Sequence, residues 1–242
     1  MRAQRQDTAR TRKNLLMAAS EIFAEKGFRD ATIAAISKRA ETNVASVNYH
    51  FGDKETLYRE AWRHSYSDSM KAYPTDGGVD MNASPIKRLA GQVFALLRRA
   101  TDADNRAFLI GFKELANPTG LLEEVMQEEM RPLRQRISTL VREVLDPDNS
   151  QMQVRFCAVS IMSQCIIPAF INMGEKPRDD SEKDSWRIDD IEGYAQHVIA
   201  FSLAGMASIG RTTKARVGVI KQKNAPQVRK STKAQAPTAD KV

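Results

Sequence analysis

Apolar residues recur at helical spacing along almost the whole chain. The first such stripe consists of Leu15, Ala19, Ile22 and Phe23, which lie at i, i+4, i+7 and i+8 and therefore share one face of a helix. Alternation with a period of two is rare, and glycine occurs only 12 times in 242 residues. The pattern predicts an all-α protein.

Four helices are expected before residue 74. The first covers residues 8–26 and ends at Gly27, a typical C-terminal cap residue. A second follows Thr32, a good N-cap, and buries Ile33, Ile36 and Ala40. After a short turn at residues 41–42, two more helices follow the N-cap residues Asn43 and Asp53, and these cover residues 44–50 and 54–72.

Further helices are expected after a loop at residues 74–84 that is rich in Gly, Asp, Asn and Pro. They cover residues 85–101, 104–116, 121–145, 150–173 and 188–209. Pro132 and Pro168 fall inside two of them and should kink or restart the helix. Residues 211–242 show no periodicity and are rich in Lys, Ala, Thr, Gln and Pro, which predicts a disordered tail.

The charge is distributed unevenly along the chain. The net charge is +7, and nine Lys/Arg against the single acid Asp240 give the tail from Arg211 a charge of +8. Residues 1–64 carry +4 and residues 65–210 carry −5. A basic head suggests that this part of the chain binds a polyanion. The polar, basic N-terminus and the lack of an uninterrupted apolar run of about 18 residues predict a cytoplasmic protein without a membrane span.

The composition offers little for metal or redox chemistry. Cys157 and Cys165 lie eight residues apart in one predicted helix, about 12 Å along its axis, so they read as small buried apolar residues and not as a disulfide. His50, His64 and His197 have no metal-ligand spacing, so neither a metal site nor a cofactor is expected. Glycine-rich phosphate loops and the common hydrolase motifs are also missing, although a catalytic set that forms only in space stays open.

The second and third predicted helices form a helix-turn-helix, which presents one short helix to the major groove of DNA. If Val47 and Phe51 face inward at i and i+4, then Ala45 and Tyr49 point outward. Ser46 and Asn48 flank this face. Serine and asparagine can hydrogen-bond base edges, whereas alanine or a tyrosine ring can contact a thymine methyl group.

Residues 40–58, which read AETNVASVNYHFGDKETLY, resemble the signature of the TetR family of regulators. That signature is a helix-turn-helix that ends in Tyr-His or Tyr-Tyr before Phe, followed by a turn and Lys-Glu-x-Leu. Residues 22–33, IFAEKGFRDATI, are similar to the upstream part of the same domain. The chain departs from the pattern at Glu41, where the family usually has glycine, and at Asn48, where tyrosine is commoner.

The resemblance implies a role in DNA binding for individual residues of the helix-turn-helix. Phosphate contacts are implied for Thr32, Tyr49, His50 and Lys54, and base-reading positions for Asn43, Val44, Ala45, Ser46 and Asn48. Simpler readings remain: Asn43 serves equally well as an N-cap, His50 caps the helix or packs on the first helix, and Lys54 is a solvated surface lysine.

Residues 85–209 resemble the ligand-binding and dimerisation half of the family. The segments MRPLR at 130–134 and IMSQC at 161–165 are similar to the CecR-like subgroup. In the family, the last two long helices of each protomer pair into a four-helix bundle. Here they carry apolar stripes that serve this interface, the protomer's own core, or both. The stripes are Val154, Ala158, Ile161, Cys165 and Pro168/Ala169, then Ile191, Ala195, Val198, Ala200/Phe201 and Ala204/Gly205.

A ligand pocket in this half would use aromatic and methionine side chains, although such residues more often belong to the core. Two polar residues in apolar surroundings, His64 and Gln164, are added as ligand contacts, although an exposed His64 on the fourth helix is an equal alternative. The full set is Trp62, His64, Tyr66, Phe94, Phe108, Phe112, Met126, Met162, Gln164 and Phe170.

These patterns predict a reader at residues 1–56, a ligand-binding and dimerisation domain at 57–210 and a basic tail at 211–242. The function favoured is that of a repressor that a small molecule releases from a palindromic double-stranded DNA operator, with a homodimer as the binding unit. The alternatives are an enzyme within the helical body and a nucleoid-type DNA-binding protein that uses the basic tail.

Overall fold

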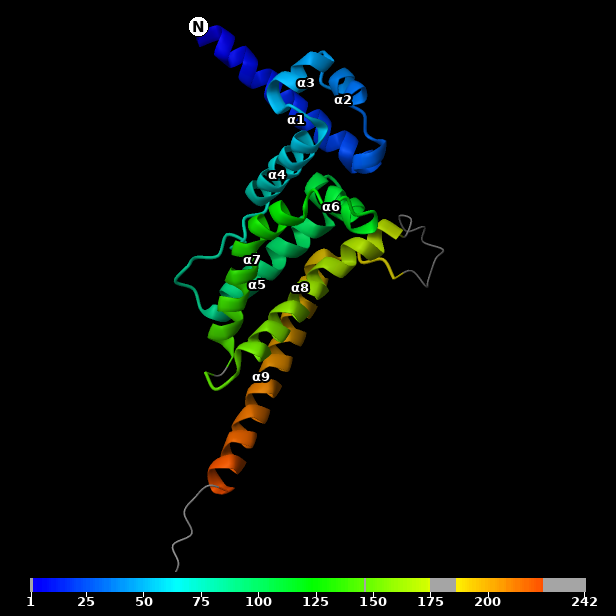
Figure 1. Ribbon diagram of the computed structural model, residues 1–242. Coiled ribbons are helices and arrows are strands. Elements are labelled where there is room, and N and C mark those ends of the chain that lie inside the picture. Colours follow the sequence, from blue (N-terminus) through cyan, green and yellow to red (C-terminus); the bar gives the residue numbers. More distant parts are fainter. Residues whose placement is uncertain (1, 146, 175–185, 224–242) are drawn as a thin grey trace, which may run out of the picture.

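The computed structural model describes residues 2–145, 147–174 and 186–223, and every regular element in these ranges is a helix (Figure 1). The helices are α1 (Arg2–Asp30), α2 (Ile33–Arg39), α3 (Val44–Phe51), α4 (Lys54–Ala72), α5 (Pro85–Thr101), α6 (Arg106–Ala116), α7 (Glu123–Val144), α8 (Gln151–Gly174) and α9 (Ile191–Lys223). The all-α prediction is confirmed.

The predicted N-caps explain why the early helices begin where they do. The side chains of Thr32, Asn43 and Asp53 accept hydrogen bonds from the backbone N–H groups of Ala35 (3.1 Å), Ser46 (2.9 Å) and Thr56 (2.7 Å). Gly27 breaks α1 with a φ of +75°, a conformation that suits glycine. At its other end α1 begins at Arg2, earlier than expected, because residues 2–7 contain neither proline nor glycine.

Two hydrophobic cores lie one above the other along the molecule. The first joins α1 to α4 and continues into α6 and the start of α7, with Phe23, Tyr58 and Trp62 among its fully buried side chains. The second joins α5, the rest of α7, α8 and α9. Figure 1 shows α1–α3 at one end and α5, α7, α8 and α9 below them. Helix α4 therefore connects the helix-turn-helix to the body.

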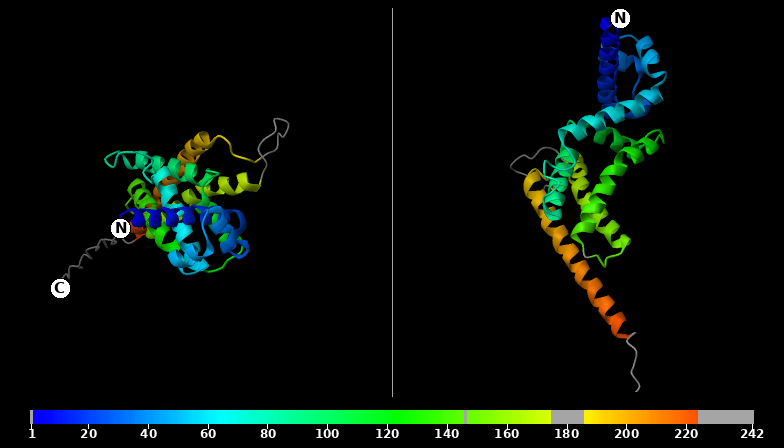
Figure 2. Two further views of the ribbon diagram at one scale, coloured as in Figure 1. Left: turned by 90° about the horizontal axis from the view of Figure 1, so that it is seen from above. Right: turned by 90° about the vertical axis from the view of Figure 1, so that its left-hand side faces the viewer.

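Helix α9 is longer than the sequence pattern predicted. Its expected end was residue 209, but it continues to Lys223, so residues 211–223 are helical and the prediction of disorder is wrong there. Arg, Lys, Ala and Gln are good helix formers, and the first proline after this segment is Pro226. In Figure 2 the last turns of α9 extend beyond the other helices. Residues 224–242 of the predicted tail lie outside the described residues.

Two other helices contain a proline that was expected to kink or restart them. Helices α7 and α8 each continue as one element through Pro132 and Pro168, so neither helix restarts there. Residues Gln151–Met173 of α8 are long and apolar enough to cross a membrane by length and composition alone. In the fold this helix packs against α5, α7 and α9.

Candidate nucleic-acid interface and ligand cavity

Helix α3 divides its side chains between the core and the solvent as the sequence predicted. Val47 is fully buried and Phe51 is 6% exposed. On the other side, Ala45 and Asn48 are exposed and 79% of Tyr49 is accessible. The exposed face carries no charged residue, and it belongs to the second helix of the helix-turn-helix.

A local hydrogen-bond network fixes the start of α3. The Asn43 side chain accepts from both the backbone N–H and the hydroxyl of Ser46, at 2.9 and 3.1 Å. The Ser46 hydroxyl in turn accepts a hydrogen bond from the hydroxyl of Thr42 at 2.9 Å. Asn43 is therefore an N-cap with an exposed side chain, whereas Ser46 is half-buried and engaged within the protein.

Glu41 occupies the turn between α2 and α3 with a φ of +53°. It is the one non-glycine residue of the described chain with a positive φ. A side chain with a Cβ atom is strained in this conformation by roughly 1–2 kcal/mol. The turn that usually contains glycine is thus preserved here with glutamate.

Lys54 and His50 are both partly buried beside the helix-turn-helix. The Lys54 ammonium lies 4.4 Å from the centre of the Phe28 ring, and burial lowers its pKa. Burial, and then the nearby Arg12 charge, lower the pKa of His50. Arg12 itself lies over the Phe51 ring at 5.1 Å and pairs with Glu60. The charge of Arg12 on α1 is thus part of the environment of His50.

A largely apolar cavity of about 210 Å³ lies in the body, where α4 to α8 meet. Helix α4 contributes residues 62, 66 and 69, and the other helices close the remaining sides. Six of the ten side chains predicted for a ligand pocket line it: Trp62, Tyr66, Phe108, Phe112, Met126 and Phe170. Phe170 faces Phe108 and Phe112 across the cavity, with ring centroids 5.6 and 5.3 Å apart.

The other four predicted pocket residues lie elsewhere. His64 lines a separate polar groove with Asp68, whose carboxylate is 3.4 Å from its ring. Phe94 and Met162 pack against the second core. Gln164 lines a surface groove between α8 and α9 and donates to the carbonyl of Ser160 at 3.1 Å. Residue type alone predicted these positions, but the helix faces that carry them point away from the cavity.

Sequence reasoning did not select Arg99 and Ser69, two buried polar residues that line the cavity. Arg99 is 5% exposed and Ser69 is 9% exposed, although both side chains are polar. Arg99 follows Gln92 and Leu96 by seven and three residues, so it shares a face of α5 with two buried residues. This spacing is the signal that could have identified it.

Buried hydrogen bonds connect α4 to the cavity wall and to α6. The Trp62 indole donates to the carbonyl of Ala107 at 3.1 Å. The Tyr58 hydroxyl donates to Glu114 at 3.1 Å, and burial, followed by the nearby Glu114 carboxylate, raises the pKa of Tyr58. Glu114 also accepts from the backbone N–H groups of Thr119 (2.8 Å) and Gly120 (3.0 Å), which hold the loop after α6.

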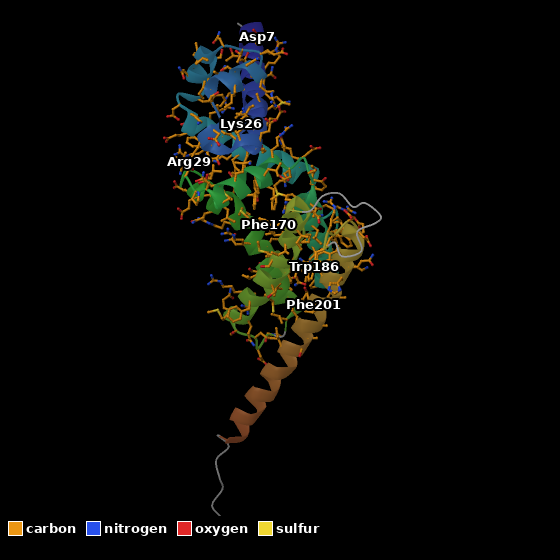
Figure 3. All side chains as sticks on the ribbon, turned by 90° about the vertical axis from the view of Figure 1, so that its right-hand side faces the viewer. Asp7, Lys26, Arg29, Phe170, Trp186 and Phe201 are labelled. Atoms are coloured by element: carbon orange, nitrogen blue, oxygen red, sulfur yellow. The ribbon has the colours of Figure 1, made fainter. Side chains whose placement is uncertain are left out.

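An exposed apolar surface runs along α8 and α9. On α8 it consists of Met152, Phe156, Val159 and Ile167, which are 54%, 62%, 54% and 49% exposed at helical spacing. On α9, Phe201, which is labelled in Figure 3, is 63% exposed, and Ala204 and Gly205 beside it are also exposed. A groove lined by Phe156, Phe201 and Gly205 connects the two stripes.

The α8 stripe expected from the sequence differs from the one that is exposed. Val154, Ala158, Ile161, Cys165 and Ala169 are buried in the protomer's own core, as are Ala195 and Val198 of α9. These residues therefore face the protomer's own core, which is one of the two readings left open by the sequence. The α8 helix is apolar on most sides, so periodicity alone could not separate the two faces. Both cysteines are buried free thiols, as expected.

Two family descriptions match this chain in separate parts. Residues 15–61 match the N-terminal domain described as "Bacterial regulatory proteins, tetR family". Residues 85–206, half of the chain, match the C-terminal domain of the "HTH-type transcriptional dual regulator CecR". The first match covers α2 and α3, and the second covers α5 to α8 and the start of α9.

Individual relatives support the same assignment. The HTH-type transcriptional repressor NicS of Pseudomonas putida is 39% identical over 72 residues, which is 30% of this chain and 33% of that protein. A TetR-like transcriptional regulator from Rhodococcus sp. RHA1 superposes with a TM-score of 0.61 at 15% identity, covering 81% of this chain and 96% of the regulator. AibR, solved with isovaleryl coenzyme A and operator DNA, gives a TM-score of 0.59 at 13% identity, with coverages of 79% and 97%. The alignments span about a third of the length of the curated relatives, and the solved structures share the fold.

Proposed function

Because the chain belongs to the TetR family of bacterial transcriptional regulators, with a C-terminal domain of the CecR type, we propose that it is a homodimeric repressor of the cytoplasm. A small molecule bound in the body releases it from a palindromic operator. The single observation that carries this proposal is the uncharged, exposed face of α3, whose opposite face is anchored in the core by Val47 and Phe51.

Base reading is assigned to the exposed residues of α3 and to its N-terminus. Ala45 and Asn48 are small or amide side chains that fit the floor of a major groove, and Val44 at the start of α3 is 47% exposed. Asn43 caps the helix with one oxygen and keeps an amide nitrogen for a base edge. Ser46 contributes only if its hydrogen bonds within the cap rearrange.

Phosphate contact is assigned to Thr32, Tyr49, His50 and Lys54. Thr32 stands at the N-terminus of α2, where free backbone N–H groups favour anions. The Tyr49 hydroxyl is exposed at the edge of the α3 face. Lys54 opens α4 directly after the turn that ends α3. These positions surround the base-reading face, as residues that fix a reader on the DNA backbone do.

Dimerisation is assigned to the apolar surface of α8 and α9. Exposed side chains as large as Phe156 and Phe201 are unfavourable in water, and a second copy of the same surface would cover them. Two heads on a two-fold axis then read two half-sites about 34–36 Å apart. This explains why a short helix such as α3 suffices for a specific site.

Release from DNA is assigned to the cavity, because its wall includes α4. Trp62 and Tyr66 stack at 5.1 Å on the cavity side of α4, and the same helix is packed against α1 in the head. A ligand between α4 and α6 favours one spacing of these helices. If that spacing does not fit the operator, binding of the ligand weakens binding of DNA.

The test is selection of bound sites from genomic DNA, followed by displacement. We expect one palindromic site, bound with a steep dependence on salt, and release by a small apolar compound. The control is a variant with Ala45→Glu on the exposed α3 face, which keeps the fold but places a negative charge against DNA. Binding to all sequences alike, or equal binding by the Ala45→Glu variant, would show that α3 is not a sequence reader.

A further inference from the structure

The most unusual group in the body is the guanidinium of Arg99 on α5. It is 5% exposed, and of all the residues that line the cavity Arg99 is the one with a charge. Nη1 donates to the carbonyl oxygen of Tyr73 at 3.3 Å and lies against the sulfur of Met70. Within the described chain Nη2 is buried and has no hydrogen-bond partner, and no carboxylate pairs with the side chain.

A buried arginine without an anionic partner is costly. Charged groups are buried in proteins when they are paired or hydrogen-bonded, and unpartnered buried donors are rare. Burial lowers the pKa of Arg99, which is the expected effect of a charge removed from water. The site therefore has a strong preference for an anion that the protein's own side chains do not satisfy.

Ser69 supplies a second buried donor to the same cavity. Its hydroxyl is buried and has no hydrogen-bond partner in the described structure. The other polar groups of the wall are already engaged. The Tyr66 hydroxyl donates to the Glu129 carbonyl at 3.2 Å, and the Asn105 side chain donates to the Arg99 carbonyl (2.6 Å) and accepts from the N–H of Phe108 (3.2 Å).

Resting on the proposed function, we propose that the effector is an apolar organic carboxylate whose carboxylate is held by Arg99 and Ser69. One arginine and one hydroxyl supply the charge and the donors that one carboxylate needs, and the planar guanidinium matches its two oxygens. The rings of Trp62, Phe108 and Phe170 surround the aromatic or alkyl body of the ligand. The polar end thus lies on α5 and α4, and the apolar end lies towards α6 and α8.

The test compares acids with their own neutral amides. The probes are phenylacetate, 3-phenylpropionate, hexanoate and octanoate, each paired with the corresponding primary amide, which has a similar shape and no charge. Binding is measured without DNA, from Trp62 emission in a Trp186→Phe background, because the chain has two tryptophans and Trp186 is 79% exposed outside the cavity. Calorimetry of the unmodified protein provides an independent value.

We expect at least one acid to bind about tenfold or more tightly than its amide, which is the value of one charge-assisted hydrogen bond. Arg99→Gln should remove this preference, and Ser69→Ala should reduce it. The matched control is Arg98→Gln, because Arg98 is the exposed neighbour that pairs with Glu192 and does not line the cavity. It should keep the preference.

The assignment is overturned if no acid in the series binds better than its amide, or if the preference survives Arg99→Gln. Circular dichroism establishes that Arg99→Gln is folded; if it is not, Arg99→Lys keeps the charge without the planar fork and should show a reduced preference. If a neutral compound releases the wild-type protein from its operator, the proposal of a carboxylate effector is refuted, whereas the proposal that the protein is a ligand-responsive repressor still holds. If an acid binds through Arg99 but no specific operator can be found, the repressor proposal is refuted and the carboxylate site is not.

Discussion

Replacing Phe201 with glutamate should separate the proposed dimer into monomers. Phe201 is 63% exposed on α9, next to the exposed Ala204 and Gly205. A phenylalanine side chain buries about 200 Å². Covering 63% of that area at about 25 cal/mol per Å² contributes about 3 kcal/mol, and a two-fold interface contains the residue twice, which gives about 6 kcal/mol.

This estimate is an upper bound, because ordering of side chains at the interface offsets part of it. Half of it, about 3 kcal/mol, still raises the dissociation constant of the dimer more than a hundredfold. Two glutamates facing each other across the two-fold axis add repulsion. Light scattering over a range of micromolar concentrations should give twice the monomer mass of 27.1 kDa for the wild type and the monomer mass for Phe201→Glu.

The matched control is Met81→Glu, which adds the same charge at an apolar side chain that is 73% exposed in the loop before α5. It should remain dimeric. Ala204→Glu tests the same surface with a small residue and should resemble Phe201→Glu. Operator affinity should fall with the dimer, since each monomer has one reading helix. A Phe201→Glu protein that stays dimeric and binds its operator as the wild type does would refute this interface.

Five further variants test the helix-turn-helix and its turn. Asn48→Ala should relax the base preference at one position of each half-site by about 1–3 kcal/mol. Lys54→Ala should instead weaken binding to all DNA sequences alike and make the affinity less dependent on salt. Affinities measured over a set of operator variants separate the two effects. Glu41→Gly should stabilise the protein by about 1 kcal/mol, because it removes strain at φ +53°, and Glu41→Ala, measured by thermal unfolding, should not. Because the folded state lowers the pKa of His50, its contribution to stability is present above about pH 6.5 and is lost as pH falls below that value. Between pH 7 and pH 5 the wild type should therefore lose more unfolding free energy than His50→Gln does. Parallel pH profiles of the two proteins would contradict this.

Local signals in the sequence predicted the head and the helix bounds well. Asp53 and Pro85 mark the starts of α4 and α5, because a capping carboxylate and a proline at the first turn act within a few residues. The outward face of α3 followed from the pair Val47 and Phe51 alone. The base and phosphate contacts stay predictions, as does the domain boundary near residue 56.

Features that depend on how distant helices pack could not be predicted in the same way. Arg98 and Arg99 are adjacent and chemically identical, yet Arg98 is exposed and Arg99 is buried. The position of α4 against α5 accounts for the burial of Arg99, since Tyr73 and Met70 cover it from the end of α4. The α8 helix presents the same difficulty, because its core stripe and its exposed stripe are both apolar.

The position of α4 gives a physical reason why ligand and DNA should be linked. Residues of α4 belong to the first core, which holds the head, and the same helix forms one wall of the cavity. Trp62 belongs to the first core and to the cavity wall: it is 2% exposed in that core, and its indole donates to the carbonyl of Ala107 in the wall. A ligand that draws Arg99 and Ser69 together acts on α5 and on the lower half of α4, whereas Lys54 and the turn after α3 lie at the upper end. A change of tilt at one end of a rigid helix must therefore move the other. A difference of 1–3 kcal/mol in ligand affinity between the two tilts is enough to change operator affinity by about 5- to 150-fold.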